Sequence, residues 1–338
     1  MRETNVLFIW NAREDLRDYL HEGLSGIGSV NLIFPEDATE EGFLRLAPDM
    51  DIIVGWRPSR DLLDAAQRLR LFINPGVGVQ HLIETFREVN QTRNVTLING
   101  HGNTYFTAQH AVAMLLALTN KLITHHNWMV EGQWRKGDSD AKSIPLRDLN
   151  VGLLGYGAVN QKVHRFLSGF DLKFNILKRS WSNEQQLPTE SGRYGPSDLN
   201  DFLKDTDILI IAVPQTDETI GLIGKNELEI LGSKGLLVNI SRGPVVDEEA
   251  LYRALLHRLI AGAAIDVWYN YQPEPDVDGR KFPTRFPIHE LDNIVLSPHR
   301  GASPMDDLKR WDEVIENIRR FADGRDDFIN VVQLDRGY

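Results

Sequence analysis

The sequence predicts an α/β protein with two parallel sheets, each covered by helices, and three observations lead to this expectation. Short apolar runs of strand length alternate with stretches of helical period, which is typical of parallel βα units. The alternation stops near residue 100 and starts again near residue 151. A chain of 338 residues also exceeds the usual size of a single hydrophobic core, so two domains are expected.

The first alternation defines a domain that begins at residue 1. The runs "NVLFIW", "DIIVGW" and "LRLFINPG" predict strands, and "REDLRDYLHEGL" and "SRDLLDAAQRL" predict helices. Near the end of the chain, "DDLKRWDEVIENIRRFADG" predicts an amphipathic helix that can return to this domain. We therefore expect a discontinuous first domain made of residues 1–100 and 299–338.

Residues 101–298 are expected to form the second domain. The stretch "TAQHAVAMLLALTNKLITHHNWMV" predicts one long, largely buried helix. Strand-length runs follow it: "VGLLG", "KFNIL", "DILIIAVP", "GLLVNIS", "AGAAIDVW" and "NIVLSPH". Helical stretches, "NDFLKD", "NELEIL" and "DEEALYRALLHRL", lie between them. Such an alternation favours a second parallel sheet.

Composition excludes several classes of function. A net charge of −11 argues against nucleic-acid binding, and no apolar run has the length of a membrane span. The N-terminus lacks the long apolar centre of a secretory signal. The absence of cysteine suits a reducing cytoplasm and leaves no thiolate for a metal site. We expect a cytoplasmic protein without a metal.

The stretch "VGLLGYGAVNQKV" predicts a dinucleotide site between a strand and a helix. Gly155 permits the tight turn, and Gly157 lets the backbone approach a pyrophosphate at the helix N-terminus. Asn160 stands where the fingerprint has its third glycine, which serves close packing of the helix on the strand. This departure is tolerable if the helix lies slightly farther out.

The second strand of this domain ends in "LKRS" and not in the acidic residue that binds an adenosine ribose. A ribose 2′-phosphate would meet Lys178, Arg179 and Ser180, which favours NADP over NAD. The alternative is that the two basic residues are simply solvated at the end of a strand.

Three later segments, "LLVNISRGPVVDEEAL", "AGAAIDVW" and "ELDNIVLSPHRGAS", together with "GYGAVN", give the chain a resemblance to the D-2-hydroxyacid dehydrogenase family. The resemblance runs from about residue 72 to residue 303, in the same order and spacing. It implies two Rossmann-like domains, a flavodoxin-like substrate domain and a doubly wound dinucleotide-binding domain. Gln80 and Gln109 depart from the acids that are common in the family.

The resemblance implies roles for residues of both domains. Arg242 would bind the substrate's carboxylate and carbonyl, and His299 would be the general acid and base. The loop residues Gly76, Val77 and Gly78 would offer backbone N–H groups to the substrate. The cofactor-binding residues implied besides those named above are Tyr156, Ala158, Val159, Val213, Pro214, Thr219, Ile240, Ser241 and Asp266.

The family's third catalytic member, a Glu before a Pro, is displaced in "DVWYNYQPEPDVDG". The usual distance from the Asp falls on Tyr271, which is not an acid. We favour Glu274, which precedes a proline and would raise the pKa of His299. The alternative, Gln272, resembles formate dehydrogenases of the same superfamily, whose further asparagine has a candidate in Asn103.

We therefore expect an oxidoreductase that reduces a small 2-oxo acid, such as glyoxylate or hydroxypyruvate, with NADP preferred or NAD. Two alternatives stay open: a formate dehydrogenase-like enzyme, and a dinucleotide-sensing protein similar to the corepressors that resemble this family. The family also implies a homodimer that uses part of residues 104–131.

Overall fold

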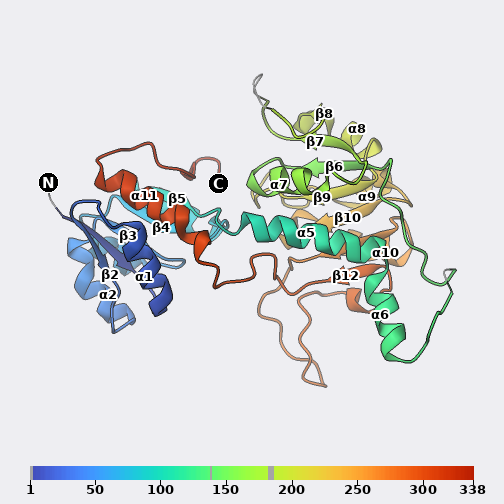
Figure 1. Ribbon diagram of the computed structural model, residues 1–338, viewed down its shortest axis with the longest axis horizontal. Helices are drawn as coiled ribbons and strands as arrows, with labels where there is room; N and C mark the ends of the chain where they lie inside the picture. The colour runs from blue at the N-terminus through green and yellow to red at the C-terminus, as the bar shows by residue number, and fades with distance from the viewer. Residues whose placement is uncertain (1–2, 138, 182–185) are drawn as a thin grey trace. The chain divides into compact units, whose positions relative to one another are not determined.

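The structure is a computed structural model that describes residues 3–137, 139–181 and 186–338 (Figure 1). The chain divides into two compact units: unit 1 comprises Met1–Asn103 and Pro304–Tyr338, and unit 2 comprises Thr104–Ser303. Unit 1 is discontinuous, and each boundary lies within a few residues of the expected one. The division places His299 in unit 2, whereas our boundary assigned it to the first domain.

Unit 1 is a parallel sheet of strand order β2-β1-β3-β4-β5, with helices on both faces. This order is that of a flavodoxin-like domain, as expected. The strands are β1 (Thr4–Phe8), β2 (Val30–Ile33), β3 (Ile52–Val54), β4 (Leu71–Asn74) and β5 (Thr96–Asn99). The α-helices are α1 (Glu14–Gly23), α2 (Glu40–Leu46), α3 (Arg60–Ala65), α4 (Ile83–Val89) and α11 (Asp312–Ala322).

Alternate side chains of these strands enter two separate hydrophobic clusters. Leu7 and Ile53 point to the cluster under α2, α3 and α4, whereas Phe8 and Val54 point to the cluster under α1 and α11. Because successive strand residues face opposite sides, an all-apolar strand is buried on both faces. The helix expected near the end of the chain, α11, thus completes the core of unit 1.

Unit 2 is a parallel sheet of strand order β12-β11-β10-β9-β6-β7-β8 (Figure 1). The strands are β6 (Asn150–Leu154), β7 (Lys173–Leu177), β8 (Ser191–Tyr194), β9 (Ile208–Ile211), β10 (Leu236–Asn239), β11 (Gly262–Ile265) and β12 (Ile294–Leu296). The α-helices are α5 (Thr104–Thr119), α6 (Leu122–Val130), α7 (Ala158–Leu167), α8 (Leu199–Lys204), α9 (Lys225–Leu231) and α10 (Glu248–Leu256). The order reverses between β6 and β9, as in a doubly wound dinucleotide-binding domain.

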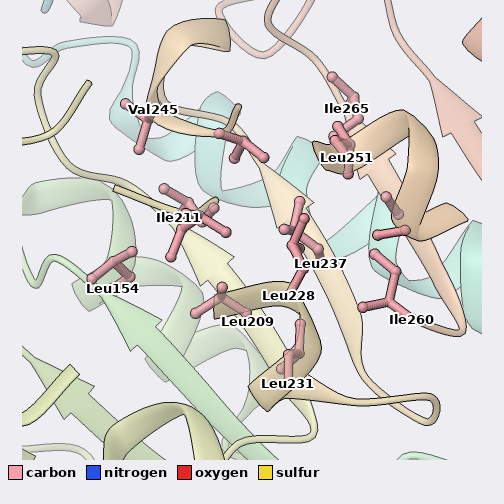
Figure 2. Packing of buried hydrophobic residues seen from close by; sticks show 14 of the residues in the cluster. Leu154, Leu209, Ile211, Leu228, Leu231, Leu237, Val245, Leu251, Ile260 and Ile265 are labelled. Atoms are coloured by element: carbon pink, nitrogen blue, oxygen red, sulfur yellow. The ribbon is translucent and has the colours of Figure 1, made fainter. Parts of the chain in front are cut away.

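Two hydrophobic clusters sandwich this second sheet. Helices α5 and α7 cover one face, and α8, α9 and α10 cover the other. Figure 2 shows the second cluster, in which Leu209, Ile211 and Leu237 of the central strands pack against Leu228 of α9 and Leu251 of α10. Both faces of the sheet are thereby covered by helices, and a site can form at the edge where the carboxyl ends of the strands lie.

The prediction of a single long helix over the "TAQHAVAMLLALTNKLITHHNWMV" stretch is wrong. The structure has two helices, α5 and α6, separated where Lys121 adopts the left-handed conformation (φ 53°). The Thr119 hydroxyl and the Asn120 amide donate to carbonyls of the last turn of α5. No residue of α6 is buried, so the expectation of burial fails there as well. Apolar spacing cannot reveal a break made by one residue.

Three strands escaped the sequence analysis: β2, β5 and β8. Their sequences, "VNLI", "TLIN" and "SGRY", are four residues long, and each forms the edge of its sheet. Edge strands carry more polar residues than central ones, so their apolar signal is weak.

Candidate functional site

The site in unit 2 is built at the carboxyl ends of the parallel strands. Because all strands run in one direction, the residues that follow them reach the same edge of the sheet. These residues are Gly155 after β6, Lys178 after β7, Val213 after β9, Arg242 after β10, Asp266 after β11 and His299 after β12.

The glycine turn has the geometry that a pyrophosphate requires. Gly155 has φ +81°, and a Cβ there would lie 2.7 Å from the carbonyl oxygen of Ala212, so a side chain is excluded. Gly157 is the N-cap of α7, where a Cβ would meet nothing within 4 Å. The space beside Gly157 at the N-terminus of α7 is thus open, which fits the approach of a dinucleotide phosphate.

Asn160 replaces the third glycine with a buried hydrogen-bonding group. Its amide nitrogen donates to the carbonyl oxygens of Gly155 (2.7 Å), Ile210 (3.3 Å) and Leu154 (3.4 Å), and the side chain is fully buried. Instead of disrupting the turn, this side chain ties α7 to β6 and β9 at the point where the strand order reverses.

A second buried polar chain supports the same turn. The Tyr156 hydroxyl is 2.8 Å from His164 Nδ1, and His164 Nε2 is 2.8 Å from the Thr189 hydroxyl. Burial raises the pKa of Tyr156 to about 12 and lowers the pKa of His164 to about 4. Both groups are therefore neutral at pH 7, as burial without a counterion requires.

The Ser241 hydroxyl joins the loop after β10 to the loop after β9, and the Thr219 hydroxyl closes the loop after β9 on itself. Ser241 donates to the carbonyl oxygen of Val213 (2.6 Å), and Thr219 donates to that of Pro214 (2.6 Å). Four of the expected cofactor-binding residues thus form one connected group at this edge. Ile240, the residue between β10 and Ser241, is buried.

Arg193, which was not predicted from the sequence, joins Lys178 at the basic end of β7. Lys178 Nζ lies 4.7 Å from the centroid of a Trp181 ring, and Arg193 Cζ lies 4.9 Å from a Trp181 centroid. Burial and the charge of Arg193 lower the pKa of Lys178. Arg179 forms an ion pair with Glu218 (2.5 Å), and Ser180 is exposed. Arg193 lies on β8, which was not expected, so no sequence signal pointed to it.

Asp266 connects the end of β11 to the turn that carries His299. Its carboxylate accepts from the Ser297 hydroxyl (2.5 Å) and from the backbone N–H groups of Arg300 (2.7 Å) and Gly301 (2.9 Å). His110 Nε2 lies 3.4 Å from the same carboxylate. Burial acts to raise the pKa of Asp266, but these hydrogen bonds outweigh it and lower the pKa. The side chain is a buried anchor.

Arg242 is held where β10 meets the loop after β11. A Cβ on the next residue, Gly243, would lie 2.3 Å from the carbonyl oxygen of Trp268, so only glycine allows this close approach. The Arg242 guanidinium donates to the carbonyl oxygen of Ser241 (2.6 Å). Burial lowers the pKa of Arg242, and Tyr271 opposes this effect. An anion bound to this half-buried guanidinium would offset the cost of its desolvation.

The backbone of His299 has a left-handed conformation (φ 57°), and its backbone N–H donates to the Ser297 carbonyl (3.0 Å). Its Nδ1 atom is 2.7 Å from the hydroxyl of Tyr271. Burial lowers the pKa of His299, Asp266 opposes the shift, and Arg242 adds to it.

The partner predicted for His299 is therefore wrong. Neither Glu274 nor Gln272 is among the hydrogen-bonding partners of His299 in the part of the chain that the structure describes, and both side chains are exposed. Tyr271, which the usual spacing had indicated, occupies that position. The expected rise in the pKa of His299 is also reversed, because a phenol brings no negative charge to offset burial.

In unit 1 the loop at Gly76–Gly78 is fixed by two asparagines that end neighbouring strands. The Asn74 amide donates to the carbonyl of Gly76, and the Asn99 amide donates to that of Val77 (2.9 Å). These two hydrogen bonds to its carbonyl oxygens fix the conformation of the loop. Neither asparagine was predicted to have this role, because Asn74 reads as the last residue of an apolar run and Asn99 ends β5, a strand that was itself not predicted.

Unit 2 is thus a dinucleotide-binding domain that places an arginine and a histidine at one edge of its sheet. A family model for the D-isomer specific 2-hydroxyacid dehydrogenase NAD-binding domain matches residues 112–301. A glyoxylate reductase of Pyrococcus furiosus is 32% identical over 297 residues, which cover 84% of this chain and 83% of that protein. The chain belongs to the D-isomer specific 2-hydroxyacid dehydrogenase family.

Another relative, a D-3-phosphoglycerate dehydrogenase of Archaeoglobus fulgidus, is 31% identical over 78% of this chain, which spans about half (48%) of its length. A Xanthobacter autotrophicus 2-hydroxyacid dehydrogenase with NADPH and MES matches at TM-score 0.78 and 24% identity, covering 99% of this chain and all of the other. A Sinorhizobium meliloti NADPH-dependent glyoxylate/hydroxypyruvate reductase with NADP and sulfate matches at TM-score 0.78 and 21% identity, with the same coverage. These structures show the fold.

The family and the fold confirm several predictions made from the sequence. The chain is an α/β oxidoreductase of the CH–OH group that uses NAD or NADP, with two Rossmann-like domains. Among the described residues, no helix combines the length and the apolar character of a membrane span.

We expect His164 to make stability depend on pH. Its pKa is about 4 when folded and near 6.5 when unfolded, so below pH 6.5 the unfolded chain binds the additional proton. The free energy of unfolding should therefore fall by about 2–3 kcal/mol between pH 7 and pH 4.5 from this group alone. Urea titrations at both pH values should give a smaller loss for His164→Gln than for the wild type. An equal loss in both proteins would contradict this; the exposed His257→Gln variant is the control.

Proposed function

We propose that this protein reduces a small 2-oxo acid, such as glyoxylate or hydroxypyruvate, to the 2-hydroxy acid, with NADPH as the preferred donor. The observation that carries the proposal is that Arg242 and His299 follow strands of the same sheet whose glycine turn fits a dinucleotide. Relatives named glyoxylate reductase, with most of their length covered, support this substrate class.

The bound nicotinamide would supply hydride to the carbonyl carbon. Arg242 would bind the carboxylate of the 2-oxo acid by paired hydrogen bonds and orient the carbonyl. His299, protonated, would give its Nε2 proton to the carbonyl oxygen as charge develops there. The N–H groups of the Gly76–Gly78 loop in unit 1 remain proposed substrate-binding groups, and Glu274 has no part in this mechanism.

The preference for NADPH is supported by the cations at the end of β7. Lys178 and Arg193 both lie against Trp181, whose indole N–H donates to the Tyr194 carbonyl (3.0 Å). A ribose 2′-phosphate would relieve the repulsion between these two cations, whereas a hydroxyl would not. Ser180 and Arg179 extend the proposed phosphate site, with Arg179 exchanging Glu218 for the phosphate.

A homodimer is also part of the proposal. Helix α6 turns away from the axis of α5 (Figure 1), and the segment that includes it exposes large apolar side chains. These are Leu122 (60% exposed), Ile123 (50%), Met129 (52%), Val130 (74%) and Trp134 (73%). Exposed apolar groups of this density are typical of protein interfaces, and a second copy would bury them. A cytoplasmic location is proposed because a chain without cysteine suits a reducing compartment.

The substrate class can be tested by following NADPH oxidation with glyoxylate, hydroxypyruvate, pyruvate and phosphohydroxypyruvate, and NAD(P) reduction with formate. We expect reduction of at least one small 2-oxo acid, and a loss of about 10²–10⁴-fold in kcat for His299→Ala with little change in NADPH affinity. Equal turnover by the variant would remove His299 from the mechanism. Formate oxidation alone would replace the proposed reaction, and cofactor binding without any turnover would favour a sensor.

The cofactor preference can be tested by measuring the affinities of NADPH and NADH. Lys178→Gln and Arg193→Gln should each weaken NADPH binding by about tenfold, through loss of a charge-assisted contact, and leave NADH within about twofold. Lys173→Gln, at the opposite end of β7, is the matched control. Equal weakening of both cofactors, or a wild type that prefers NADH, would contradict the preference.

The dimer can be tested by light scattering after gel filtration. The wild type should have about twice the mass of the chain, and Ile123→Lys combined with Val130→Asp should convert it to a monomer, because buried charges oppose association. Val277→Asp, at a fully exposed loop position, controls for the added charge. A monomeric wild type, or the same effect from the control, would refute this interface.

A further inference from the structure

The loop after β11 delivers a tyrosine to the active-site histidine. The loop is anchored by Trp268, whose indole N–H donates to the Ser297 carbonyl (2.9 Å), and by Tyr269, whose hydroxyl donates to the Val246 carbonyl (2.9 Å). Tyr271 follows two residues later, and its hydroxyl lies 2.7 Å from His299 Nδ1 and 3.3 Å from the Trp268 backbone nitrogen. Its position is therefore set by fixed parts of unit 2.

A hydroxyl can serve both charge states of an imidazole. It has one proton to donate and two lone pairs, one of which accepts from the Trp268 N–H. When His299 is neutral with its proton on Nε2, the hydroxyl can donate to Nδ1; when the neutral ring carries its proton on Nδ1, the hydroxyl oxygen accepts from it. When His299 is charged, Nδ1–H donates to the hydroxyl oxygen, and the phenolic proton turns to water, which reaches it because the side chain is 55% exposed. A carboxylate, by contrast, accepts only and stabilises the charged ring.

We propose that Tyr271 is the positioning residue of His299, and that it holds the ring in both charge states through one uncharged hydrogen bond to Nδ1. This inference rests on the proposed function, because it concerns proton transfer by His299. In reduction the His299 Nε2–H bond breaks as the substrate O–H bond forms, while Nδ1 keeps its proton and continues to donate it to the Tyr271 oxygen. In oxidation the same proton returns to Nε2.

The proposal has a consequence for the pH range of the reaction. Within unit 2, the titratable and charged groups that act on His299 are Tyr271, Asp266 and Arg242. Asp266 is committed to Ser297, Arg300 and Gly301, so among the described residues of unit 2 the ring has no carboxylate as a hydrogen-bonding partner. Because burial then lowers the pKa of His299, reduction should lose rate at a lower pH than it would with an acidic partner.

Three variants separate this role from a purely structural one. Tyr271→Phe should lower kcat by about tenfold, since the ring loses its orientation, with KM within about twofold. Tyr271→Glu should move the alkaline limit of reduction up by about one to two pH units, because a carboxylate favours the charged ring. Glu274→Gln tests the competing carboxylate and should leave that limit in place.

The same shift can be measured without any substrate. An NMR titration of the His299 ring signal, assigned by its loss in His299→Asn, should give a midpoint below 6.5 in the wild type and a higher one in Tyr271→Glu. Unchanged NADPH affinity in each variant would show that unit 2 is folded. A midpoint that responds to Glu274→Gln and not to Tyr271→Glu would overturn the proposal. If the protein titrates as expected but is inactive on every 2-oxo acid, the proposed function is refuted, whereas the hydrogen bond between Tyr271 and His299 is supported.

Discussion

The parallel direction of the strands in unit 2 is the constraint on which the site depends. It brings six loops to one edge of the sheet, and hydrogen bonds between those loops then fix their side chains. Asp266 links β11 to the turn that holds His299, Ser241 links β10 to β9, and Asn160 links α7 to β6 and β9. The chemistry of the site thus depends on buried groups that need not touch a ligand themselves.

Much of the fold could be predicted from the sequence, because the central strands are continuous apolar runs that alternate with amphipathic helices. The prediction failed where the signal was short or local. Polar residues interrupt or shorten the apolar runs of the edge strands β2, β5 and β8, and the break between α5 and α6 depends on the left-handed backbone of Lys121. A departure of one residue from helical geometry leaves the spacing of apolar residues nearly unchanged.

Several residues of the site could be predicted from the sequence, but the contacts between them could not. The glycine turn, Arg242 and His299 stand in segments that resemble a known family, and the family itself is confirmed. The partner of His299 was misjudged because we sought a carboxylate before a proline, whereas the loop carries Tyr271 to that place. Arg193 joins Lys178 only because β8 pairs with β7, and spacing along the chain cannot reveal such a pairing.

The most direct measurement follows the hydrogen that the nicotinamide is proposed to transfer. NADPH carrying deuterium at C4 of the nicotinamide, on each face in turn, would be incubated with the protein and glyoxylate, and the product examined by mass spectrometry. We expect glycolate with one deuterium on C2 from one of the two labelled faces, because the hydride passes directly to the carbonyl carbon. Glycolate without label from either face, or no glycolate despite bound NADPH, would contradict a hydride-transfer site at this edge of the sheet.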